Sequence, residues 1–362
     1  MLRVLFIEDD KEAIKTILDR IDQDERDIER SECDFHEAEE KIWALRPDIV
    51  VLDLFEGALL RENDRGSDLL GLIWEKQFFP VVVHTALPEA LEGYENPFVH
   101  VLKKGIESSE TVLEAIRSLE PHVRSLKEVD KHIRESFAFA LRDVAPFAYE
   151  TFEEAKQRND AILRGGRRRL AALMDEHPGT DQVLASWEQY ICPPLSQDML
   201  LGDILRKTDK EGADPSLFRV VLSPSCDLVS SGGREPKVRE ILVAKCCSTK
   251  RGIEFLGWGN MNTRKLKDRL DSVLSRGYSE ALVPLPALRG RVPTMMANLR
   301  ELELIPFGDV GCESDRFLRV ASLDSPFREL ISWAYIQASG RPGLPDRDLT
   351  FWREEIVADF QS

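Results

Sequence analysis

Four short apolar runs, each followed by a polar residue, constrain the fold of this chain more than any other feature. They lie within residues 4–7, 48–54, 81–84 and 99–102. The runs are uninterrupted and rich in β-branched residues, which is typical of strands buried on both faces of a parallel sheet. The stretches between them are long enough for helices, so the pattern predicts an α/β fold.

The predicted sheet has five strands, because residues 27–35 supply one more, polar strand at an edge of the sheet. Helices are expected at residues 11–22, 37–45, 67–74, 88–94 and 109–119. Regular alternation of strands and helices predicts a doubly wound five-stranded parallel sheet of strand order 2-1-3-4-5.

The residues that follow these strands are chemically matched. Glu8 and Asp9 follow the first apolar run, Asp53 follows the core of the second, and Thr85 and Lys103 follow the last two. Carboxyl ends of parallel strands meet at one edge of a sheet, so these side chains are expected to converge. Two carboxylates ~4 Å apart repel by about 4 kcal/mol at an effective dielectric constant near 20, which calls for a cation. Mg2+ suits such oxygen ligands.

A carboxylate beside a bound cation can attack phosphorus and form an aspartyl phosphate. In this arrangement Asp53 is the expected nucleophile, and the hydroxyl of Thr85 and the ammonium of Lys103 are expected to hold the phosphoryl oxygens.

At these positions residues 1–122 resemble the receiver domain of two-component response regulators. That family has an acidic pair after the first strand, a phosphoacceptor Asp after the third, Ser or Thr after the fourth and Lys after the fifth. The resemblance implies that Asp53 is phosphorylated by a histidine kinase or a phosphotransfer protein. It also implies an Mg2+ ion held by Glu8, Asp9, Asp53 and the backbone carbonyl of Phe55.

Three departures from the family pattern affect the expected site. Residues 56–65 are expected to form a longer, charged loop after the phosphoacceptor. Lys103 is followed by Lys104 and Gly105 where the family usually has proline, so Lys104 is an alternative phosphate contact. His100 stands at the position of the usual switch aromatic residue, which makes a non-standard readout the expectation.

Residues 123–178 are expected to form a helical connector. Pro121 and Pro146 are expected to break its helices, and Gly165 and Gly166 to interrupt the last one. An apolar stripe recurs at helical spacing and comprises Leu126, Val129, Ile133, Phe137, Leu141 and Val144. It has two interpretations, a surface for a homodimer or other docking partner, and packing within its own domain.

Arginines at residues 164 and 167–169 form the densest basic cluster of the connector. A solvated helix face is the favoured interpretation, beside contact with the acidic receiver or with nucleic-acid phosphates. The net charge of −15 in residues 1–120 contrasts with −1 in the remainder. This disfavours nucleic acid as a general partner without excluding it.

Composition describes a soluble globular protein, with 43% hydrophobic and 31% charged residues. No apolar run approaches the ~20 residues that span a membrane, and no signal-peptide pattern opens the chain. A cytoplasmic location and reduced cysteines are therefore expected.

Residues 179–362 are expected to form an α+β effector domain. Short strands are predicted at residues 218–222, 240–243, 253–256, 281–283, 302–305 and 317–320, and helices at 263–274 and 326–338. All six histidines precede residue 178, so this domain cannot build a Ser-His-Asp or Cys-His unit from its own residues. Binding of a protein target is thus the favoured output, and enzymatic activity of this domain is left open.

The alternative output is hydrolysis. Residues 201–205 and 219–224 faintly resemble the opening strands of SH3-like-barrel endoribonucleases, although no catalytic residue can be transferred. Cys226 and Asp227 follow a predicted strand and are a second candidate pair. A zinc site of four thiolates is a minor alternative, built from Cys226, Cys246, Cys247 and Cys312.

Overall fold

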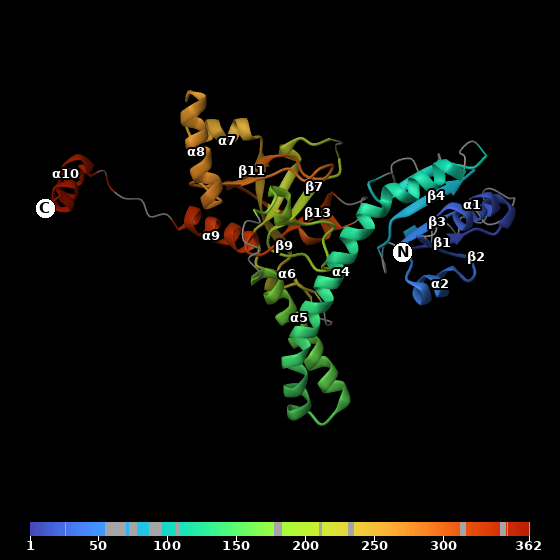
Figure 1. Ribbon diagram of the computed structural model, residues 1–362. Coiled ribbons are helices and arrows are strands. Elements are labelled where there is room, and N and C mark those ends of the chain that lie inside the picture. The colour runs from blue at the N-terminus through green and yellow to red at the C-terminus, as the bar shows by residue number, and fades with distance from the viewer. Residues whose placement is uncertain are drawn as a thin grey trace. The chain divides into compact units, whose positions relative to one another are not determined.

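The computed structural model describes residues 1–25, 27–54, 70–71, 78–86, 96–105, 109–176, 183–209, 212–230, 235–311, 316–340, 345 and 347–361. The chain divides into two compact units, Met1–Thr180 and Asp181–Ser362. Figure 1 shows the elements of both units in chain order.

The first unit contains the predicted five-stranded parallel sheet, in the order β2-β1-β3-β4-β5. Its strands are β1 (Leu2–Ile7), β2 (Ile28–Cys33), β3 (Ile49–Leu52), β4 (Val81–Thr85) and β5 (Val99–Lys103). All four residues of β3 are buried, as expected of a strand covered on both faces. The predicted fold class and strand order are confirmed.

Apolar clusters cover both faces of this sheet. Helix α1 (Lys11–Asp24) and the first turns of α4 (Ser109–Thr151) pack on the face that carries Phe6 and Val51. Helix α2 (Ala38–Leu45) packs on the opposite face, with Leu70. The predicted helix at 88–94 lies outside the described residues, and only 70–71 of the predicted helix at 67–74 are described, as helical.

Helix α4 is continuous over 43 residues and passes through Pro121 and Pro146. The prediction that these prolines break the helix is wrong. A proline removes one backbone donor, and here packing outweighs that loss, since Leu119 and Val123 are buried on either side of Pro121.

Helix α5 (Ala155–Glu176) is also continuous, and it packs along α4. A Cβ at Gly165 would lie 2.7 Å from Cγ1 of Val144, and one at Gly166 would lie 3.0 Å from Cδ2 of Leu141. The glycines therefore allow close helix packing and do not interrupt the helix, contrary to the prediction.

This packing divides the predicted apolar stripe of α4 into two parts. The segment around Leu141 and Val144 packs on α5, which confirms the interpretation of packing within the domain for that part. Val129 and Ile133 remain exposed. Among the arginines of α5, Arg169 pairs with Asp143 of α4, whereas Arg164, Arg167 and Arg168 are exposed, as expected of a solvated face.

The second unit is built on an eight-stranded sheet, in the order β10-β11-β9-β8-β7-β13-β12 with β6 paired to β13. Its strands are β6 (Tyr190–Ile191), β7 (Asp203–Lys207), β8 (Phe218–Val221), β9 (Glu240–Cys247), β10 (Leu282–Leu285), β11 (Met295–Pro306), β12 (Val310–Gly311) and β13 (Phe317–Leu323). The pairings are antiparallel except between β12 and β13. The prediction of short strands with appended helices is confirmed in outline.

The helices of this unit are α6 (Ser225–Leu228), α7 (Thr249–Phe255), α8 (Thr263–Arg276), α9 (Phe327–Ser339) and α10 (Leu349–Gln361). The strand predicted at residues 253–256 is wrong, because α7 begins after the cap Ser248 and continues through most of this segment. Helix α10 was not predicted. Within the described residues, no helix is long and apolar enough to cross a bilayer.

Candidate functional site

Three carboxylates converge at the carboxyl edge of the parallel sheet. Glu8 follows β1 and Asp53 follows β3, and both are buried, while Asp9 is exposed. One oxygen from each of the three lies within 4.8 Å of the others, which is the spacing of a metal-ligand set. The carboxylate oxygens fit a hard divalent ion such as Mg2+. Phe55, the fourth predicted ligand, lies outside the described residues.

Backbone hydrogen bonds hold these acids in position. The Asp53 amide donates to the carbonyl of Ile7 at 3.1 Å, which ties the end of β3 to the end of β1. The Leu54 amide donates to Oδ1 of Asp53 at 2.7 Å and orients its carboxylate. Asp10 caps α1 by accepting from the Glu12 amide, so the acidic turn doubles as a helix start.

Lys104 contacts two of these acids. Its Nζ donates to Oδ2 of Asp53 at 2.8 Å and also contacts Oε2 of Glu8. The sequence placed this role on Lys103 and kept Lys104 as the alternative. Lys103 is the last residue of β5 and pairs in register with Thr85, whereas Lys104 lies in the turn beyond the strand.

Burial and pairing set the charge state of this cluster. Burial raises the pKa of Glu8 to about 7, with Lys104 opposing the rise. Burial alone would lower the pKa of Lys104, but its hydrogen bonds to Asp53 and Glu8 outweigh that effect and raise the pKa. Lys104 is therefore charged at neutral pH and neutralises part of the acidic cluster.

Thr85 ends β4 and is fully buried, and its carbonyl accepts from the Lys104 amide at 2.8 Å. The backbone thus links the predicted hydroxyl residue to the lysine that contacts Asp53. Beside it, His84 is buried, and burial lowers its pKa to about 4. Within the described part of the chain, neither ring nitrogen of His84 has a hydrogen-bond partner.

The candidates of the second unit do not assemble into a comparable cluster. Sγ of Cys226 lies 3.6 Å from Oδ1 of Asp227, and Lys237 holds that same oxygen at 3.1 Å. Cys246 and Cys247 are adjacent on β9 and belong to different apolar clusters. Among the described residues, the only group of side chains spaced closely enough to hold a metal ion is that of Glu8, Asp9 and Asp53; Cys312 lies outside them.

Neither a protein-family model nor a curated protein matches the sequence. Among solved structures, the chain is similar to the receiver domain of PhyR from Erythrobacter litoralis, at 24% identity over 33% of this chain and 89% of that one, with a TM-score of 0.27. The receiver domain of HemR from Leptospira biflexa matches at 27% identity over 33% of this chain and 94% of that one, with a TM-score of 0.27.

A mutant of the anti-anti-sigma factor PhyR from Bartonella quintana matches at 22% identity over 32% of this chain and 47% of that one, again with a TM-score of 0.27. These neighbours cover the N-terminal third. The strand order of the first unit and the residues at its sheet edge are those of the receiver fold.

Proposed function

We propose that this protein is a phosphorylation-controlled response regulator in which Asp53 accepts a phosphoryl group with the help of Mg2+. The observation that carries the proposal is the convergence of Glu8, Asp9, Asp53 and Lys104 at the carboxyl edge of the parallel sheet. A histidine kinase or a phosphotransfer protein is the proposed donor, as the resemblance to receiver domains implies.

Each of these groups has a role in the proposed chemistry. A carboxylate oxygen of Asp53 attacks phosphorus while the bond from phosphorus to the donor's nitrogen or oxygen breaks, and the leaving group takes up a proton. Mg2+ would be held by Glu8, Asp9 and Asp53 and would neutralise charge on the transferring group. Lys104 already lies against Asp53, so its ammonium can pair with a phosphoryl oxygen, with Thr85 as the proposed hydroxyl donor.

Phosphorylation adds negative charge and acceptor oxygens beside Lys104, which then exchanges its contact with Asp53 for one with the phosphoryl group. Because the Lys104 amide is bonded to the carbonyl of Thr85, this exchange acts on the ends of β4 and β5. Such a change biases two arrangements of the sheet edge, which is the proposed switch.

For the second unit we propose a protein-binding output. Its buried charged groups are engaged in structural pairs, since Arg219 binds Glu303 at 2.7 Å and Asp203 binds Ser322 at 2.5 Å. These contacts stabilise the sheet and engage the side chains of Arg219 and Asp203. This weighs against a hydrolase active site that uses these two residues. The homodimer expected from the stripe on α4 remains a prediction for its exposed part, around Val129 and Ile133.

The test is phosphorylation of the intact chain by a small phosphodonor. With Mg2+ and acetyl phosphate, the intact mass should increase by one phosphoryl group, and hydroxylamine should remove it. Asp53→Asn should stay unmodified, whereas Glu12→Gln, which alters an exposed acid nearby, should be modified like the original chain. An unmodified mass, or modification that persists in Asp53→Asn, would refute the proposal.

A further inference from the structure

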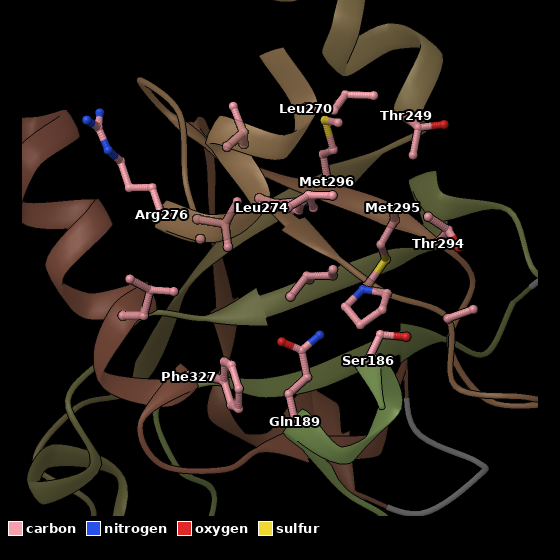
Figure 2. A pocket seen from close by; sticks show the side chains of 18 of the residues that line it. Ser186, Gln189, Thr249, Leu270, Leu274, Arg276, Thr294, Met295, Met296 and Phe327 are labelled. Carbon is pink, nitrogen blue, oxygen red and sulfur yellow. The ribbon is translucent and has the colours of Figure 1, made fainter. Parts of the chain in front are cut away.

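The second unit contains a pocket of about 840 Å3 that the phosphoryl chemistry of the first unit does not use. Figure 2 shows side chains from α8, from β11 and from the start of α9 around it. The wall is mainly apolar and includes Leu270, Leu274, Met295, Met296, Phe327 and Leu330. Methionine side chains adapt to irregular partners, and both methionines extend their sulfur atoms in this region.

The rim of the pocket is apolar and open to solvent. Leu184 and Leu274, which both line it, are 61% and 60% exposed. Polar side chains are few and lie around the wall, with Ser186 and Gln189 on one side in Figure 2. An apolar rim of this kind fits a partner that lies across the opening and inserts several side chains, as an amphipathic helix does in a groove.

The chain carries a helix with the matching pattern. In α10, exposed large apolar side chains recur at intervals of three, four and four residues, namely Leu349, Trp352, Ile356 and Phe360. None of the residues of α10 is buried. A helix of 13 residues gains little stability by itself, so this apolar stripe needs a partner surface to hold it.

The charges of the two surfaces are complementary. Helix α8, which forms one wall of the pocket, carries five basic residues and two acidic ones: Arg264, Lys265, Lys267, Arg269 and Arg276 against Asp268 and Asp271. On α10, Glu355 and Asp359 lie one turn apart along one edge of the apolar stripe, and Arg353 lies along the other edge. Of these basic residues, Arg276 is the one that lines the pocket, so an acidic edge of a docked helix would meet its guanidinium there.

The chain between the helices is long enough for α10 to reach the pocket. Nine residues separate the end of α9 at Ser339 from the start of α10 at Leu349, and such a segment spans up to about 30 Å. The part of α9 that lines the pocket, Phe327 to Ile331, lies at most about 18 Å from Ser339 along the helix axis.

We propose that the pocket is a helix-binding groove and that α10 of the same chain is its occupant. Trp352 and Ile356 enter the apolar wall, Leu349 and Phe360 cover its ends, and the edge that carries Glu355 and Asp359 faces Arg276 of α8. A partner helix with the same apolar pattern would then compete with α10 for the groove.

A peptide of residues 347–361 tests this proposal against the intact chain. The double variant Trp352→Ser, Phe360→Ser should release its own α10 and bind the peptide at least tenfold more tightly than the unaltered chain, because the resident helix no longer competes. Adding Leu274→Glu, an exposed change in the pocket wall, should weaken that binding at least tenfold. Phe351→Ser alters an exposed aromatic residue off the stripe and should behave like the unaltered chain.

Hydrogen exchange of α10, measured at several protein concentrations, separates the alternatives. Protection of α10 that is independent of concentration and is lost in the double variant supports docking within one chain. Protection that rises with concentration together with a doubled mass would overturn it in favour of exchange between two copies. Failure of the peptide to bind the double variant, or an apolar small molecule retained in the pocket in native mass spectrometry, would also overturn it.

Discussion

Nζ of Lys104 lies 2.8 Å from Oδ2 of Asp53, although the two residues are 51 positions apart in the chain. The contact places the cation beside the atom that we propose to be phosphorylated. It has two consequences of opposite sign, because the ammonium attracts a phosphoryl group and repels a metal ion.

Replacing Lys104 by Met should therefore slow phosphorylation of Asp53 while strengthening Mg2+ binding. A charge-assisted hydrogen bond contributes ~1.5–3 kcal/mol, so the rate with acetyl phosphate should fall by about 10- to 150-fold at saturating Mg2+. Calorimetric titration should show a lower dissociation constant for Mg2+. Lys103→Met is the matched control and should change both quantities much less; a larger effect at Lys103 would assign the contact to that residue.

Mg2+ binding should depend on pH through Glu8. Its folded-state pKa of about 7 means that the proton competes with the metal below neutrality and is released as the pH rises through 7. The ionised fraction of such a group rises about tenfold between pH 6 and pH 8, so the affinity should rise by about the same factor. Glu8→Gln should bind Mg2+ weakly with a flat pH profile. Equal affinities of the unaltered chain at both pH values would contradict this assignment.

A bulkier residue at Gly165 should separate α5 from α4. A Cβ there would lie 2.7 Å from Val144, so Gly165→Leu should lower the unfolding free energy of the α4–α5 pair by about 1–3 kcal/mol, although leucine has a better helix propensity than glycine. Thermal unfolding followed by helical circular dichroism measures the loss. Val144→Ala should restore part of it in the double variant, and Ala172→Leu, at an exposed position of α5, should leave stability unchanged.

Removing only one partner of the Arg219–Glu303 ion pair should destabilise the second unit more than removing both. The guanidinium of Arg219 is buried and donates to Glu303 and to the carbonyls of Ser216 and Phe218. Glu303→Ala leaves that charge without its carboxylate and should cost about 2–4 kcal/mol, somewhat less than a fully buried pair because Glu303 is partly exposed.

The double variant Arg219→Met, Glu303→Leu should recover most of this stability, since apolar replacement of both partners removes the uncompensated charge. Chemical denaturation, monitored by hydrogen exchange in β8 and β9, isolates the transition of the second unit. Equal losses in the single and double variants would mean that the pair itself stabilises the sheet.

The first unit could be predicted from sequence because its central strands β1, β3 and β4 are almost entirely buried, on both faces of the sheet. Such strands need continuous apolar runs, and the polar residues after them mark the sheet edge, as Asp53 does after β3. The identity of the lysine at the edge was harder to predict. Lys104 lies in a turn beyond β5, where the alternation of side chains along a strand no longer indicates direction.

The structure of the second unit was harder to predict from sequence, for a different reason. Residues 253–256 are apolar enough for a strand, but the cap at Ser248 starts a helix that includes Ile253 and Phe255. The pocket draws its wall from segments that are more than 100 residues apart, from Leu184 to Ile331. No local sequence pattern predicts such a pocket, because its wall forms only when the fold brings these distant segments together.

Because α4 is one uninterrupted helix, it can carry a movement at the parallel sheet to a distant part of the first unit. Val123 is the last of its residues buried in the cluster on the sheet face, and the helix continues to Thr151. At 1.5 Å per residue the helix from Val123 to Thr151 is about 42 Å long, and Lys127 pairs with Asp48 near its start. A tilt of the helix by about 5° at the sheet would move its end near Thr151 by about 4 Å. A small displacement at the acidic edge would therefore become a shift as wide as a side chain where α4 meets α5.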